Sequence, residues 1–278
     1  MQKFSIAALA LLAGISLPSG AAQAQTRGGF EIGAEVFDYA YRERDSGETI
    51  VFDDGTIGGF RLGYTQRIGG GLFLRARLSA GFGSVDYRAP DPGGDARIRN
   101  VDQTIGQLEL HLGKDFKIGG ASTLTAFAGL GARSLRDGSG GREATDGSLG
   151  YDREVNYAYV PVGLEARLPV SKASAILLSA QYNWVVGGDS TSRFSDIDSE
   201  LPDVELELDR GHGFEASAAF QTKVGSHALS FGPFVRHWKI GRSESFIVAN
   251  TDDPADQLEF YEPKNRTTEL GLRLTFGF

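Results

Sequence analysis

The sequence predicts an all-β protein in which ten antiparallel strands close into one up-and-down barrel, with the apolar side chains facing outward. Three observations predict this fold class. Glycine supplies 38 of the 278 residues, about twice its usual share, which disfavours a mainly helical chain. Beyond about residue 25, apolar and polar residues alternate with period two in segment after segment, which is typical of strands with two unlike faces. The connections between these segments alternate between short and long.

Residues 1–24 have the pattern of a secretory signal peptide. Lys3 supplies a positive charge, residues 4–17 are mostly apolar, and Ala22-Gln23-Ala24 has the small-x-small form of a cleavage site. We therefore predict cleavage after Ala24, export, and a single barrel domain over residues 25–278. A short membrane anchor is the alternative, but about fourteen apolar residues are few for a hydrocarbon core about 30 Å thick.

Ten segments show the strand alternation, and each is at least as long as the 9 to 11 residues, roughly, that a tilted membrane strand needs. The alternation of apolar and polar residues is weak over residues 204–242, so a barrel of eight strands is the fallback. Pro161 and Pro233 fall inside two of the segments, where we expect β-bulges because proline removes a ladder hydrogen bond. The predicted strands are residues 28–43, 56–68, 71–87, 100–116, 122–136, 153–169, 174–187, 204–223, 226–242 and 264–278.

The connections favour a membrane barrel over a soluble sandwich. An up-and-down meander places every short turn at one rim and every long loop at the other, whereas a Greek-key sandwich does not require this alternation. An even number of strands also returns both termini to the rim with the short turns. The predicted turns are residues 69–70, 117–121, 169–173 and 222–226, and the predicted loops, mostly acidic or glycine-rich, are 45–55, 89–99, 137–152, 188–203 and 243–265.

Composition excludes several classes of function. The absence of cysteine excludes a disulfide scaffold, a thiolate metal site and a cysteine nucleophile. A net charge of -8 disfavours nucleic-acid binding. Beyond the N-terminal segment the chain has no apolar run long enough for a membrane-spanning helix.

With these patterns the chain resembles the small outer-membrane β-barrels of Gram-negative bacteria, a group of porin-like surface proteins. The likeness covers nearly the whole mature chain, and its most specific part is the last strand. That strand looks like the signal that the outer-membrane assembly machinery reads in this family. The resemblance implies an outer-membrane location and, as partners, the assembly machinery, membrane lipids and lipopolysaccharide. The residues of the signal are Leu270, Leu272, Leu274, Phe276 and Phe278.

If the apolar faces meet lipid, the opposite faces place acids and arginines inside the barrel. Ten strands enclose little more space than eight, which side chains fill completely, and buried charges need partners. We therefore predict a salt-bridged interior and a structural or surface-interaction role. The alternative is a narrow channel for water, ions or small solutes, while a general porin needs about 16 strands. The predicted luminal charge network is Glu31, Glu35, Arg61, Arg67, Arg75, Arg77, Glu109, Arg133, Glu165, Arg167, Glu215, Glu269 and Arg273, with Arg236 as a further candidate.

A second alternative is a surface hydrolase of the outer membrane, which needs a nucleophile, a histidine base and an orienting carboxylate at the outer rim. Of the four histidines, only His212 and His237 fall near the outer half, and His212 lies on the lipid-facing phase. We predict no catalytic residue, no enzyme activity and no cofactor.

The acidic segment from Asp196 to Glu207 invites a comparison with calcium sites. Asp196-x-Asp198-x-Glu200 mimics the spacing of a calcium loop, but Leu201 and Pro202 stand where that loop needs glycine. We predict an ordinary solvated loop without a metal site, whose carboxylates bridge to lipopolysaccharide through diffuse divalent cations.

Aromatic residues lie near the predicted strand ends, where amphipathic rings anchor a barrel at the lipid headgroups. The predicted girdle is Tyr39, Tyr41, Tyr64, Tyr87, Tyr151, Tyr157, Tyr159, Tyr182, Trp184 and Trp238.

Overall fold

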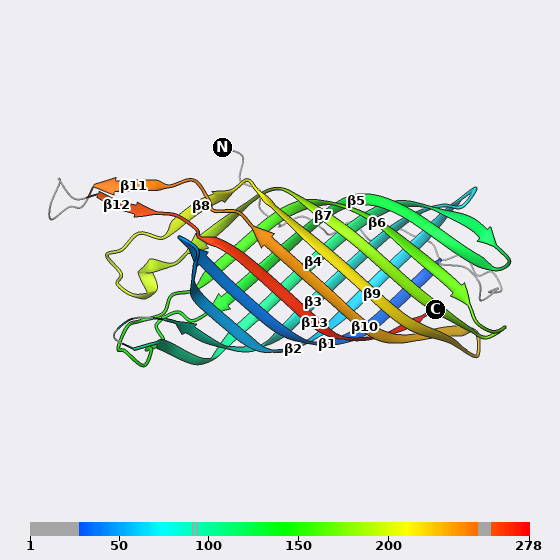
Figure 1. The fold of residues 1–278 in the computed structure, drawn as a ribbon, viewed down its shortest axis with the longest axis horizontal. Coiled ribbons are helices and arrows are strands. Elements are labelled where there is room, and N and C mark those ends of the chain that lie inside the picture. Colours follow the sequence, from blue (N-terminus) through cyan, green and yellow to red (C-terminus); the bar gives the residue numbers. More distant parts are fainter. Residues whose placement is uncertain (1–27, 91, 93, 250–256) are drawn as a thin grey trace.

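The computed structural model describes residues 28–90, 92, 94–249 and 257–278, so the predicted signal peptide, residues 1–24, lies outside the described residues. The described chain forms a closed antiparallel barrel of ten strands, which confirms the predicted fold and strand number (Figure 1). The ring closes where the first barrel strand pairs with the last. The barrel strands are β1 (Gly29–Asp45), β2 (Glu48–Gly69), β3 (Leu72–Ala89), β4 (Ala96–Gly119), β5 (Ser122–Gly138), β6 (Arg153–Pro169), β7 (Ser174–Ser192), β9 (Gly211–Val224), β10 (His227–Ile240) and β13 (Lys264–Gly277).

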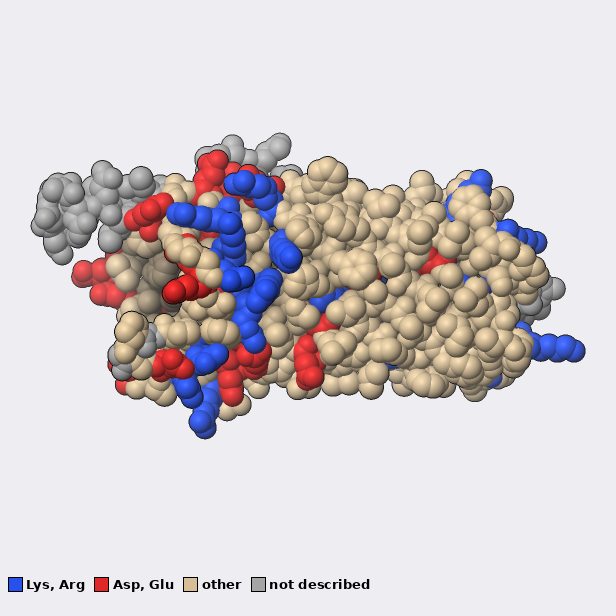
Figure 2. Space-filling model, viewed as in Figure 1, with Lys and Arg blue, Asp and Glu red and all other residues tan. Residues whose placement is uncertain are grey.

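Strand alternation gives the barrel an apolar outer wall and a polar interior. In β3, Leu74 and Phe82 are about half exposed on the outside, whereas Phe73 and Arg75 are buried inside. The ten steps from Leu72 to Phe82 rise about 25 Å at about 3.3 Å per residue and a tilt of about 40°, the height of a membrane barrel's apolar band. Figure 2 shows this band as a broad surface nearly free of charge. Among the described residues, no helix is both long and apolar enough to cross a membrane.

Both ends of the described barrel lie at the rim with the short turns, because Glu31 near the start of β1 pairs with Gly277 at the end of β13. The opposite, outer rim carries the longer connections. One of these contains a single 3-10 turn, Phe194–Asp196, and β8 (Val204–Leu208), which pairs with β7. Another contains the hairpin of β11 (Phe246–Ala249) and β12 (Gln257–Phe260), which extends beyond the barrel in Figure 1.

Two predicted boundaries are wrong at the outer rim. The expected loop 45–55 is a two-residue turn, Ser46-Gly47, with φ angles of 48° and 93°. Two consecutive residues with positive φ form the tight turn of a two-residue β-hairpin. β1 and β2 therefore continue up to this turn, well past the apolar band. The expected strand 204–223 is interrupted, since β8 ends at Leu208 and β9 begins at Gly211.

The expected bulges at the two prolines are also wrong. Pro233 stays in register with Leu272, and the β9 pairs on either side of it, Phe231 with Phe220 and Phe234 with Ser217, keep one register. In β6 the register shift lies between Ala158 and Tyr159, not at Pro161. The inward and outward phases therefore continue across Pro233, and Arg236 faces the interior.

Half of the predicted aromatic girdle lies inside the barrel. Tyr182 and Trp184 are exposed on the outer wall, as expected. Five others occupy inward positions and are buried, because the strands extend beyond the membrane band and large rings fill that part of the interior. These five are Tyr39, Tyr41, Tyr157, Tyr159 and Trp238.

Candidate functional site

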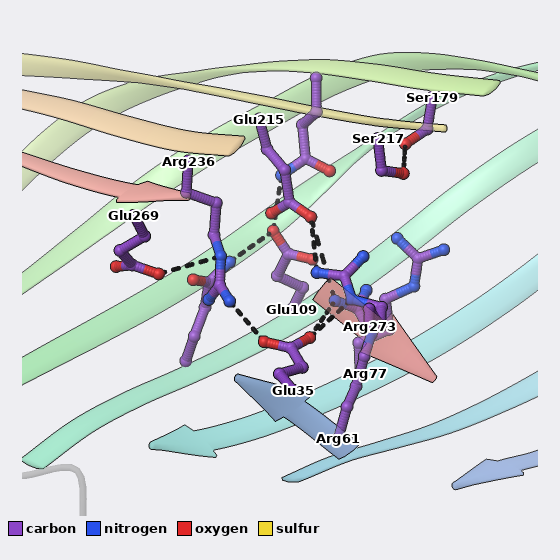
Figure 3. Close-up of polar contacts among 12 residues, drawn as sticks. Glu35, Arg61, Arg77, Glu109, Ser179, Glu215, Ser217, Arg236, Glu269 and Arg273 are labelled. Atoms are coloured by element: carbon purple, nitrogen blue, oxygen red, sulfur yellow. Dashed lines mark hydrogen bonds and ion pairs between the residues drawn. The ribbon is translucent and has the colours of Figure 1, made fainter. Parts of the chain in front are cut away.

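The centre of the barrel holds a connected network of charged side chains. Strand register creates it, because neighbouring strands carry opposite charges at facing positions: Glu35 faces Arg273, and Arg236 faces Glu269 on one side and Glu215 on the other. Facing opposite charges stabilise a sheet. Figure 3 shows Arg236 between Glu35 and Glu269.

The four residues Glu35, Arg236, Glu269 and Arg133 are linked in one chain of ion pairs, which Arg273 joins at Glu35. Arg236 binds Glu35 through one terminal nitrogen, and its Nε lies 3.1 Å from Oε2 of Glu269. Arg133 binds the other oxygen of Glu269. Arg273 donates from Nε to Oε1 of Glu35 at 2.6 Å. A buried charge is tolerated only when it is paired. These ion pairs therefore allow the charged side chains to be buried inside the barrel.

The network continues across the lumen toward the short turns. Arg273 reaches Oε1 of Glu215 at 3.1 Å, and Nη1 of Arg61 lies 3.6 Å from Oε1 of Glu35. Arg75 forms a bidentate pair with Glu165 at 2.7 and 3.2 Å, the arrangement that a planar guanidinium favours.

The remaining predicted residues also face inward. Arg77 donates to Glu165 at 2.9 Å. Glu109 accepts instead from neutral donors, the hydroxyl of Tyr159 at 3.0 Å and Nε2 of Gln181 at 2.6 Å. Arg67 pairs at 3.0 Å with Asp115, an inward acid that the sequence analysis missed. Glu31 and Arg167 line the wall of a cavity near the short turns.

Two separate cavities lie along the barrel axis. The one near the short turns has a volume of about 290 Å³ and is lined by five arginines and three glutamates. The one near the outer rim has about 20 Å³, room for about one water molecule. They share no lining residue. Between them lies a packed layer in which every side chain is at most 2% exposed: Arg133, Tyr159, Phe234, Trp238 and Glu269.

A cluster of carboxylates lies in the interior on the outer side of this layer, and the sequence analysis missed it. Arg153 binds Glu43, and its Nη1 lies 3.7 Å from Oε1 of Glu262. The hydroxyl of Tyr41 donates to Oε1 of Glu43 at 2.8 Å. We call Glu43, Asp53, Asp137, Glu262 and Arg153 the outer cluster.

The outer cluster lies beyond the apolar band, where the outer wall is polar and Arg42 pairs with Asp54. Burial raises the pKa of Asp53 well above its ordinary value, and the neighbouring Asp137 raises it further. Burial likewise raises the pKa of Glu262 to about 6. Burial also raises the pKa of Asp137, so Asp53, Asp137 and Glu262 each hold a proton to higher pH than an exposed carboxyl group does.

The histidines show no catalytic arrangement. His212 faces outward and stacks on Tyr182, and Nδ1 of His237 contacts the hydroxyl of Thr268 at 2.8 Å on the outer wall. His227 packs against Phe276 and Phe278 at the opposite rim, and buried His111 packs on Phe127. All four lie in the described part of the chain, and none of them contacts both a carboxylate and a hydroxyl.

The acidic loop uses its carboxylates to hold backbone N–H groups, both its own and that of a neighbouring loop. Oδ2 of Asp196 accepts the backbone N–H of Asp152 at 2.9 Å, and Oδ1 of Asp198 accepts that of Glu200 at 3.0 Å. Within the described ranges, no three acidic or histidine side chains are arranged to hold a metal ion.

No protein-family model matches the chain, and no curated protein matches it. Among solved structures, the outer membrane protease OmpT from Escherichia coli is similar over 90% of this chain and 97% of its own, with a TM-score of 0.53 and 10% identity. The translocator domain of the autotransporter NalP from Neisseria meningitidis has a TM-score of 0.37 at 10% identity, over 89% of this chain and 88% of its own. The Pseudomonas putida toluene transporter TodX has 0.35 at 11% identity, over 91% and 90%. At such identities the likeness to OmpT shows the fold alone: this chain has the fold of a Gram-negative outer-membrane β-barrel.

Proposed function

We propose that this protein is an exported, integral barrel of a Gram-negative outer membrane with a closed interior. Its role is structural or surface interaction through its outer rim, without catalysis. The observation that supports this most strongly is the packed layer around Trp238, Arg133 and Glu269, which separates the two cavities. A conducting pore needs a continuous wet path, and this layer interrupts it.

The outer rim supports the interaction role. The strands continue past the apolar band, and the longer connections at this end carry acidic side chains (Figure 2). Interaction sites commonly lie on loops that a rigid scaffold positions, and a salt-bridged barrel is such a scaffold.

Conductance in a planar bilayer tests the closed interior. Purified barrel should insert without discrete current steps across the ordinary range of voltages. Discrete steps that change with Arg75→Glu or Glu165→Arg would contradict the proposal, because both residues line the lumen.

The channel remains the second candidate, and the cavity of about 290 Å³ is the observation that favours it. If the ion pairs of the central network separate, this cavity extends toward the outer rim. The same bilayer recording distinguishes the two functions, since a gated channel shows steps and a closed scaffold does not.

We further propose that the last strand carries the assembly signal. Leu270, Leu272 and Leu274 are about half exposed or more on the outer wall, and β13 is the strand that closes the ring with β1. Deletion of Phe278 should lower the amount of folded protein in the outer membrane. An unchanged yield would contradict this role.

A further inference from the structure

A groove on the outside of the barrel collects positive charge. It lies between the outer ends of β9, β10 and β13, beside the end of β1, and has a volume of about 360 Å³. Its charged lining is entirely basic, with no acidic residue. We call it the basic groove, and its cations are Arg44, Arg210, Lys239, Lys264 and Arg266.

The charge of the basic groove is largely uncompensated. Only Arg210 has an ion pair there within the described residues, with Asp209 at 3.2 Å, and both side chains are well exposed. In another sector of the outer wall two exposed cations have acidic partners: Arg136 lies 2.6 Å from Glu154, and Arg88 lies 3.7 Å from Asp95. One sector of the wall therefore presents an excess of cations that the protein itself does not neutralise.

The basic groove lies directly above the apolar band, and this position indicates what kind of ligand it meets. Along β13 the outward residues Leu272 and Leu270 are each 60% exposed, and Arg266 lies four residues before Leu270, nearer the outer rim. His212 on β9 and Arg210, which immediately precedes this strand, lie two and four residues from exposed Phe214 toward the outer rim, just above the apolar band. Figure 2 shows a column of basic side chains, with acidic ones beside it, at the border of the uncharged band and over the ends of strands that lie in front in Figure 1. This is the level of lipid headgroups at the outer surface.

We infer that the basic groove binds the phosphate groups of a phosphorylated lipid of the outer leaflet. Arginine and lysine form short, charge-assisted bonds with phosphate oxygens. The exposed apolar residues directly below the groove, on β9, β10 and β13, provide the surface along which acyl chains continue. A free anion would contact only the cations of the basic groove, whereas a phosphorylated lipid would also contact the apolar wall below them. The lipid therefore fits the site better. The inference rests on the proposed outer-membrane location.

Binding of lipid A, with two phosphates, tests the inference. The full mature barrel is folded in zwitterionic detergent with a chelator, and its affinity is measured for lipid A, for the same lipid without phosphates, and for inorganic phosphate. Lipid A should bind at least about tenfold more tightly than either, the ratio that one lost charge-assisted contact produces.

Variants locate the site. Lys239→Gln combined with Arg266→Gln should weaken binding of lipid A by about tenfold or more. The matched control, Arg88→Gln combined with Arg136→Gln, removes two cations from the outer ends of β3 and β5 in another sector of the wall and should leave affinity unchanged. Heat-modifiable gel mobility verifies that all variants fold.

Three results would overturn the inference: equal loss in the control variant, equal binding of inorganic phosphate, or binding that disappears with the chelator. The last result would instead indicate divalent bridging by the acidic loops. The result is independent of conductance, so a conducting barrel that still binds lipid A through the basic groove would overturn only the closed-interior proposal.

Discussion

Removing Glu269 should destabilise the barrel severely, because this fully buried carboxylate contacts both Arg133 and Arg236. Glu269→Ala leaves two guanidinium groups in the packed layer with one acid fewer between them. Breaking a buried pair by removing one partner costs about 3–5 kcal/mol. The free energy of unfolding should fall by about this amount.

The assay is reversible urea unfolding of the barrel in lipid vesicles, followed by tryptophan fluorescence. The control is Glu154→Ala, which removes the partner of Arg136 at the surface. An exposed pair contributes about 0–1 kcal/mol, so the control should stay near wild type. If the two variants lose the same free energy, the packed layer does not depend on its charges, and the reasoning fails.

Three further predictions use other parts of the chain. Gly213→Ala places a Cβ 2.4 Å from the ring of Trp238 and should cost about 1–3 kcal/mol in urea unfolding, whereas Gly58→Ala, with open space around it, should be neutral. Burial raises the pKa of Glu262 from 4.5 to about 6, so the folded state holds the proton longer and stability falls, by about 2 kcal/mol, as pH rises between these values. Glu262→Gln should abolish that fall, while exposed Glu244→Gln should leave it unchanged. The mass of the exported protein should correspond to a chain beginning at Gln25, and a retained N-terminal segment would contradict the predicted cleavage.

The sequence predicts the faces of the strands well because side chains alternate with period two, and a single local pattern assigns every residue of a strand. Leu270 to Phe278 and Leu72 to Phe82 are examples. The inward position of Arg236 followed from the same alternation once Pro233 proved to leave the register intact.

Partners across the lumen are not predictable in this way. Arg133 and Glu269 are 136 residues apart, and Arg75 and Glu165 are 90 apart. Their contact depends on how far the strands are staggered when the ring closes, which no local pattern records. Register accounts only for facing pairs such as Glu35 with Arg273.

The outer ends of β1 and β2 were missed because residues 45–55 were expected to form a loop. Asp45-Ser46-Gly47 is a turn signal followed by the strand-forming Thr49, Ile50 and Val51. Reading it as a tight turn would have extended β1 and β2 and placed Glu43 and Asp53 inside. Tyr39 and Tyr41 on β1 would then have been assigned to the interior instead of the headgroup girdle.

The central claim is that apolar side chains face hydrocarbon while the Arg and Glu faces point into the lumen, and the two tryptophans of the chain test it directly. Trp184 is 68% exposed on the outer wall, and Trp238 is 1% exposed inside. In vesicles containing lipids with brominated acyl chains, Trp238→Phe, which keeps Trp184, should be strongly quenched, and Trp184→Phe, which keeps Trp238, should not. Equal quenching of both variants, or quenching of Trp238 alone, would contradict the account.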